Sequence, residues 1–135
     1  MMPNVRDLGK KYGINKFRYR ELYYFCLQYQ SWIDELNYKT STVKSVEITD
    51  MPLTHNNSSA TERLAIRRSE LQSKCELIEQ TAIETDSELY RYIIKAVTEE
   101  HVGFNYLVTV MDMPCSRNTF YERRRRFYYL LDKKI

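Results

Sequence analysis

Glycine and proline are scarce in this sequence, with three of each among 135 residues. Both residues interrupt helices, and stretches in which β-branched residues alternate with polar ones are also few. A chain of this length forms one domain or two small ones and can bury a real core. The composition therefore predicts an all-α protein with a helical scaffold, and residues 39–60 form the long irregular loop expected within it.

Cysteine and histidine are also few, and their positions exclude the common metal sites. Cys26, Cys75 and Cys115 are far apart and lack ligand spacing, and His55 is remote from His101. We also find no nucleophile beside a base and no phosphate-binding glycine loop. We therefore expect no metal, no cofactor and no enzymatic activity.

Long apolar runs are missing as well. No stretch is apolar over the roughly 20 residues that span a bilayer, and we find no signal peptide. Together with three cysteines that we expect to be reduced, these features predict a cytoplasmic protein without membrane contact.

The positive charge lies at the two ends of the chain. Residues 115–135 contain seven Lys or Arg and two Asp or Glu, a net charge of +5, whereas residues 47–101 contain six and eleven, a net charge of −5. A basic end that coincides with a structural motif is typical of nucleic-acid binding. The N-terminal residues 1–15 are also basic, and we expect a frayed arm or a short helix that ends at Gly9 or Gly13.

Aromatic residues are concentrated in the first long helix that the pattern predicts, Lys16–Tyr38. Apolar residues recur there at steps of three and four, as in an amphipathic helix. Burial explains most of these rings, but their number exceeds what one small core needs. A dimer or partner face is therefore a second interpretation, and stacking on single-stranded bases is a third. The residues assigned to a partner interface are Tyr23, Tyr24, Tyr29 and Trp32.

The middle of the chain divides at two capping signals. Ser58, Ser59 or Thr61 can cap a helix that begins at about Thr61, directly after the irregular loop. Thr85 and Glu88 have the spacing of a capping box, Asp86 and Ser87 are also good cap residues, and together they predict another helix. We therefore expect three regions, an N-terminal aromatic helix with the loop, central helices, and a C-terminal unit: residues 1–60, 61–101 and 102–135.

The C-terminal unit has the pattern of a helix-turn-helix. Apolar residues between Phe104 and Met111 predict a short helix, and Pro114 stops it because proline lacks an amide hydrogen and restricts the residue before it. Ser116 then caps a second helix, which contains four consecutive arginines. This order of elements presents the second helix to a major groove.

The second helix of this unit has an apolar side and a basic side. Phe120, Phe127 and Leu131 share the side that we expect to pack on Leu107 and Met111. The N-terminal residues of such a helix reach base edges, where arginine suits guanine, asparagine suits adenine and glutamate suits cytosine. The candidates for base reading are Arg117, Asn118, Thr119 and Glu122. The candidates for phosphate binding are Arg123, Arg125, Arg126 and Lys133, whereas Arg124 is expected to pack over Tyr128 or Leu131.

Two stretches of the sequence resemble a known family. The run from Met113 to Arg126, MPCSRNTFYERRRR, and the block from Met51 to Arg67, with MPL, NSSATE and LAIR, are similar to the RinA/ArpU-like regulators of phages and integrated elements in Gram-positive bacteria. The resemblance extends from the first long helix to the end of the chain. It implies a sigma-factor-like last domain whose helix-turn-helix reads promoter DNA, with the segment from Ser116 onward as the recognition helix.

The leading interpretation is a sequence-specific, DNA-binding transcriptional regulator of a phage or an integrated mobile element. We expect it to bind double-stranded DNA as a homodimer, with RNA polymerase or another protein as a further partner. Two alternatives stay open. One is a packaging protein that recognises phage DNA, and the other is a protein-binding effector such as an anti-CRISPR protein, which would use the acidic middle and the aromatic helix.

Overall fold

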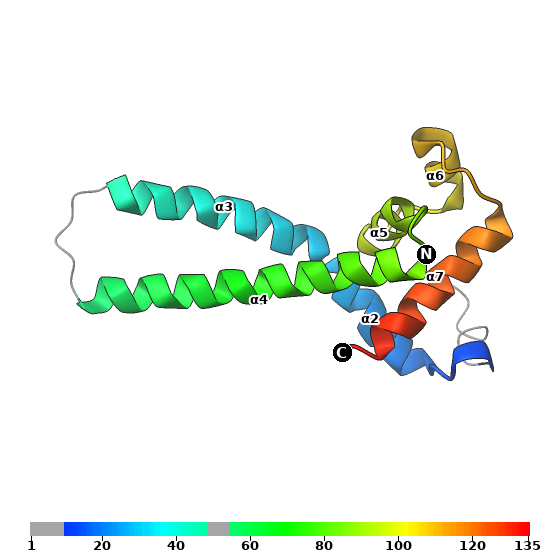
Figure 1. Cartoon of the computed structure of the whole chain (residues 1–135), viewed down its shortest axis with the longest axis horizontal. Helices are drawn as coiled ribbons and strands as arrows, with labels where there is room; N and C mark the ends of the chain where they lie inside the picture. Colours follow the sequence, from blue (N-terminus) through cyan, green and yellow to red (C-terminus); the bar gives the residue numbers. More distant parts are fainter. Residues whose placement is uncertain (1–9, 49–54) are drawn as a thin grey trace. The chain divides into compact units, whose positions relative to one another are not determined.

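The computed structural model describes residues 10–48 and 55–135, and within these ranges every regular element is a helix (Figure 1). Residues 10–12 are helical and end at Gly13, which has φ of 70°. The longer helices are α2 (Lys16–Leu27), α3 (Tyr29–Ile48), α4 (His55–Thr85), α5 (Tyr90–Thr98), α6 (Phe104–Met111) and α7 (Arg117–Asp132). The prediction of an all-α protein is confirmed for the described residues.

The chain forms two compact units. The larger unit joins Met1–Gln28 with Leu77–Ile135, and the smaller unit is Tyr29–Glu76. The predicted regions 1–60, 61–101 and 102–135 follow the chain, whereas the larger unit brings together segments from both ends of it. The C-terminal helices therefore share a core with α2.

The core of the larger unit lies where α2 packs against α5 and α7, and α5 also packs against α6 and α7. The Tyr19 ring of α2 meets the Tyr128 ring of α7 edge to face, with centroids 5.1 Å apart. Burial of each large apolar side chain contributes about 1.5–3 kcal/mol to stability. The largest fully buried side chains here are Tyr19, Tyr128, Phe120, Phe127, Leu22, Ile78, Ile93, Leu107, Leu131 and Val97.

The smaller unit is an antiparallel pair formed by α3 and the first part of α4. Trp32, Leu71 and Cys75 are buried. The Arg67 Nε donates to Glu35 Oε2 at 3.1 Å, and the Lys74 ammonium lies 5.3 Å from the centre of the Trp32 ring. These two contacts, Arg67 with Glu35 and Lys74 with Trp32, show that the helices run antiparallel.

The predicted helix Lys16–Tyr38 is wrong in one respect, because it breaks at Gln28 into α2 and α3. The Gln28 N–H donates to the carbonyls of Phe25 and Cys26, which closes the last turn of α2. No glycine or proline stands at the break, so the local sequence carries no signal for it. The break coincides with the border between the two compact units.

The prediction of a long irregular loop near residues 39–60 is also wrong. Residues 39–48 complete α3, and α4 begins at His55 rather than at Thr61. Only residues 49–54 of that segment lie outside the described residues. Serine, threonine and asparagine cost only about 0.5 kcal/mol each in a helix relative to alanine, so helix pairing overrides their local preference.

The turn that leads into α5 is capped by Asp86, one of the predicted cap residues, and the predicted Thr85–Glu88 capping box does not form. The Thr85 hydroxyl donates to the Thr81 carbonyl at 2.8 Å and continues α4, so it does not form a capping box with Glu88. Asp86 takes that role, since its Oδ1 accepts from the N–H groups of Glu88 at 2.9 Å and Leu89 at 3.0 Å. Thr85 is buried, whereas Asp86 is half-buried, and its carboxylate reaches both amides.

The C-terminal helices follow the predicted order of helix, turn and capped helix. Asp112 ends α6 in the left-handed conformation, with φ of 55°, and the Met113 N–H donates to the Leu107 carbonyl at 3.1 Å. Ser116 Oγ then accepts from the Thr119 N–H at 3.2 Å and caps α7. The apolar side of α7 was expected to pack on Leu107 and Met111 of α6, but its main contacts are with α2 and α5. At its start, α7 meets α6 where Phe104 and Phe120 lie 6.0 Å apart.

The left-handed Asp112 gives a direct test of the turn. Replacement by glycine removes the strain of a Cβ in this conformation. The free energy of unfolding of Asp112→Gly is therefore expected to equal that of the wild type or to exceed it by up to about 1 kcal/mol. Asp112→Val is expected to lower the free energy of unfolding by about 1–2 kcal/mol, because a β-branched residue resists this conformation. Urea titration measures both values, and equal stability of the glycine and valine variants would contradict the left-handed turn.

Candidate nucleic-acid interface on α7

The helix α7 has one buried side and one side that faces outward. Phe120, Phe127, Tyr128 and Leu131 are buried between α2 and α5. The residues on the opposite side of the helix are exposed or half-exposed: Asn118, Glu122, Arg125, Arg126, Tyr129 and Lys133. We call these six residues the outer face of α7. Most of the predicted DNA-contacting residues belong to it.

The predicted base-reading residues at the start of α7 differ in the contacts that their side chains make within the protein. The Arg117 Nη2 donates to Asn105 Oδ1 at 3.2 Å, and its guanidinium lies 4.9 Å from the centre of the Phe104 ring. Thr119 takes part in the cap, because its hydroxyl also accepts from Ser116 Oγ at 3.0 Å. Asn118 is exposed.

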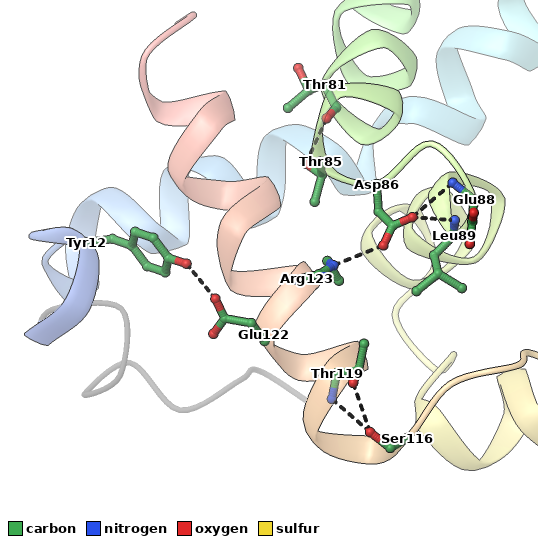
Figure 2. A network of polar contacts seen from close by, with 10 residues as sticks. All are labelled: Tyr12, Thr81, Thr85, Asp86, Glu88, Leu89, Ser116, Thr119, Glu122 and Arg123. Carbon is green, nitrogen blue, oxygen red and sulfur yellow. Dashed lines mark hydrogen bonds and ion pairs between the residues drawn. The ribbon is translucent and has the colours of Figure 1, made fainter.

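Glu122, the fourth predicted base reader, is held by the N-terminal segment of the chain. The Lys11 ammonium donates to Glu122 Oε1 at 2.6 Å, and the Tyr12 hydroxyl donates to the same oxygen at 2.9 Å (Figure 2). The Arg125 Nη2 donates to Glu122 Oε2 at 3.4 Å. The hydrogen bond from Lys11 outweighs partial burial and holds the pKa of Glu122 below its ordinary value. Glu122 is thus an ionised carboxylate whose charge is balanced within the protein.

The four consecutive arginines have four different environments. Arg123 Nε donates to Asp86 Oδ2 at 2.9 Å, on the side of α7 away from Tyr12 (Figure 2). The Arg124 guanidinium lies 5.4 Å from the centre of the Phe120 ring and 4.8 Å from that of Tyr121. Arg125 pairs with Glu122, and Arg126 is exposed. Arg124 therefore packs over apolar rings as expected, but these are Phe120 and Tyr121 rather than the predicted Tyr128 or Leu131.

The two lysines at the end of α7 also separate. The Lys133 ammonium lies 4.2 Å from the centre of the Tyr129 ring and is exposed on the outer face. Lys134 instead donates to Glu84 Oε2 at 2.7 Å and to Thr81 Oγ1 at 3.1 Å, which ties α7 to α4. Lys133 is therefore placed toward solvent, whereas Lys134 stabilises the larger unit.

Asp86 balances the charge of Arg123 on the side of α7 away from Tyr12. Burial alone would raise the pKa of the Asp86 carboxyl, but the N–H of Leu89, the Arg123 guanidinium and the N–H of Glu88 hold that pKa below its ordinary value. A polar hollow beside this pair is lined by Ile83, Glu84, Thr85, Asp86, Ser87, Glu88, Arg123 and Arg126. Of its three carboxylates, Asp86 is paired with Arg123 and Glu84 with Lys134, and Arg126 borders both this hollow and the outer face.

The predicted partner-interface residues differ in exposure. Tyr23 and Trp32 are buried, with 8% and 6% of their surface exposed, so they belong to the protein interior. Tyr29 is half-buried. Tyr24 is 55% exposed and remains accessible to a partner. Sequence alone could not separate them, because adjacent rings of an aromatic helix all fit an apolar pattern.

The described residues contain no group of three or more His, Cys, Asp or Glu side chains that could hold a metal ion. All three cysteines are free; Cys26 and Cys75 are buried, and burial raises the pKa of the Cys26 thiol. A helix both long and apolar enough to cross a bilayer is not found in residues 10–48 and 55–135.

The contacts of Lys11 and Tyr12 with α7 and the pairing of Asp86 with Arg123 are the main features that sequence reasoning missed. No protein-family model, curated protein or solved structure matches this chain. The assignment of function therefore depends on the geometry of α7 and on the expectation raised by the sequence motifs.

The Asp86 cap and ion pair can be tested by unfolding experiments. Asp86→Ala removes the cap and is expected to lower the free energy of unfolding by about 1–2 kcal/mol at pH 7. Asp86→Asn keeps a capping oxygen, so its free energy of unfolding is expected to fall by less than that of Asp86→Ala. Because the folded-state pKa of Asp86 is depressed, its ionic contribution is present above its ordinary pKa of 3.8 and is lost as the pH falls through the folded value.

The wild-type advantage over Asp86→Asn should therefore shrink when the pH is lowered from 7 to 3. Glu88→Gln is the matched control, because it removes one charge from the same turn while its backbone N–H still bonds to Asp86. Its expected effect is within about 0.5 kcal/mol. A difference between wild type and Asp86→Asn that is independent of pH would contradict the assigned ion pair.

Proposed function

We propose that this protein is a sequence-specific, DNA-binding transcriptional regulator that places the outer face of α7 in a major groove. The observation that carries the proposal is the charge of this face. It holds Arg125, Arg126 and Lys133 against a single carboxylate, Glu122, which Arg125 contacts on the same helix. A helix with a surplus of outward cations beside a polar residue at its N-terminal end suits phosphate binding combined with base reading.

The side chains have distinct roles in this proposal. Asn118, exposed on the first turn of α7, is the candidate for reading adenine, since an asparagine amide can make two hydrogen bonds with that base. Arg117 reads guanine once it exchanges Asn105 for a base edge. Arg126 and Lys133 bind phosphates, with Arg125 as a third cation. Arg123 and Arg124 instead hold α7 in the protein, through Asp86 and through the rings of Phe120 and Tyr121.

The biological setting comes from the resemblance to RinA/ArpU-like regulators, which makes the promoters of a phage or an integrated mobile element the proposed targets. A homodimer is part of this proposal, because two copies would place two α7 helices on two half-sites. Contact with RNA polymerase is a further proposed step. Exposed Tyr24 on α2 is available for a protein contact of this kind.

Selection of random double-stranded DNA with the purified chain tests the proposal most directly, if it is carried out at two salt concentrations. We expect a recurrent sequence to be enriched at both. Binding that has no sequence preference and disappears at the higher salt concentration would point to phosphate contacts alone and would contradict specific regulation.

Two α7 variants then distinguish base recognition from phosphate binding. Asn118→Ala is expected to weaken binding to the selected sequence by about ten- to a hundred-fold and to relax preference at one position. Arg126→Ala is expected to weaken binding to all sequences and to reduce the dependence of log affinity on log salt by about one unit. Fluorescence anisotropy over a salt series measures both effects.

Arg91→Ala is the matched control for Arg126→Ala. Arg91 is an exposed arginine of the same compact unit, but it lies on α5 and bonds to the Tyr90 hydroxyl at 3.3 Å. It should leave affinity and salt dependence unchanged. An equal effect of both arginine substitutions would mean that α7 is not the DNA-contacting helix.

A further inference from the structure

The outer face of α7 is partly covered by the chain's own N-terminal segment. We call Lys10–Tyr12 the strap. The Tyr12 ring stacks on the Tyr129 ring with centroids 4.8 Å apart, while the Tyr12 hydroxyl and the Lys11 ammonium both bind Glu122. Glu122 and Tyr129 lie two turns apart on the same side of α7, so the strap crosses the middle of this face.

We propose that the strap is an autoinhibitory element that must leave the outer face of α7 before this helix can enter a DNA groove. This inference rests on the proposed function. A helix with its side chains is about 10–12 Å across, and the major groove is about 12 Å wide. A groove that already contains α7 has no room for another aromatic side chain between Tyr129 and the bases.

The chain is built so that the strap can move without the rest of the larger unit. The residue after the strap, Gly13, has φ of 70°, and no atom lies within 4 Å of the position where a Cβ would stand. Ile14 is 2% exposed, and Asn15 Oδ1 caps α2 by accepting from the N–H groups of Phe17 and Arg18 at 2.9 Å each. The fixed part of the chain thus begins at Ile14, and Gly13 is the hinge.

The contacts of the strap are of the kind that DNA can displace. The Lys11 side chain is 56% exposed and that of Glu122 is 29% exposed, so solvent and phosphate both reach the pair. DNA phosphates compete with Glu122 for Lys11, and release of Tyr12 frees the middle of the outer face. A phosphorylated or otherwise anionic partner protein is not required for this exchange, since the DNA backbone itself supplies the competing charge.

The sign of one substitution decides the proposal. Tyr12→Ala changes no charge, removes the ring contact and breaks the hydrogen bond to Glu122, so it is expected to tighten DNA binding by about ten-fold. Tyr12→Phe keeps the ring and is expected to give a smaller gain. If Tyr12 were instead part of the DNA-contacting surface, Tyr12→Ala would weaken binding. Weaker or unchanged affinity therefore overturns the proposal.

Two controls accompany this measurement. Phe17→Ala removes a 63% exposed ring of the same unit that lies beside Lys16 and Arg20 rather than on α7, and it should leave affinity unchanged. Lys11→Ala is compared with Lys10→Ala, which loses the same charge one position away. The strap predicts that Lys11→Ala binds DNA more tightly than Lys10→Ala, whereas simple phosphate binding by both lysines predicts equal losses.

A readout without DNA separates this proposal from the proposed function. Carbon-13 NMR of the Glu122 side chain is expected to show a pKa below the ordinary value in the wild-type protein, because Lys11 donates to this carboxylate, and a return toward that value in Lys11→Ala. An ordinary Glu122 pKa in the wild type would mean that the strap does not hold. A second outcome is a depressed Glu122 pKa together with no DNA binding by either the wild type or Tyr12→Ala. This result would contradict both the proposed DNA binding and the autoinhibition, although the contact between the strap and Glu122 would be established.

Discussion

The burial of one side of α7 fixes the orientation of the other. Tyr128 and Phe127 lie in the core with α2 and α5, and Tyr128 meets Tyr19 edge to face. The helix cannot turn about its own axis without exposing these rings, and loss of a large buried ring costs about 3–5 kcal/mol. The outward direction of Asn118 and Arg126 is therefore a property of the fold. A rigid support of this kind is what precise recognition by side chains requires.

Charge compensation gives the cations of α7 separate tasks. Asp86 neutralises Arg123, Glu84 neutralises Lys134, and Glu122 is shared by Lys11 and Arg125. Exposed pairs of this type contribute at most about 1 kcal/mol each. Their larger effect is on position, because an arginine held by the turn between α4 and α5, as Arg123 is by Asp86, is not available at the outer face. Adjacent, identical residues thus divide into those that brace the helix and those that point to solvent.

Local sequence signals predicted the helix from Phe104 to Met111, the stop near Pro114 and the Ser116 cap, since each depends on residues a few positions apart. The apolar side of α7 was predicted for the same reason. Long-range pairings were not predictable, because nothing near Glu122 indicates that it will meet Lys11. Residues 39–48 show a second limit, since weak helix propensity is overridden when two helices pair.

The larger unit is discontinuous along the chain, and this has a consequence for how the protein folds. The side chains of Arg18 and Asp132 bond at 2.6 Å although they are 114 positions apart. Such a contact forms only after most of the chain has been synthesised, and contacts of high sequence separation slow folding. Until α7 emerges from the ribosome, α2 can pack only on α5 and its Tyr19 ring lacks the Tyr128 ring. A chain cut before α7 would thus leave the N-terminal helix with only part of its core.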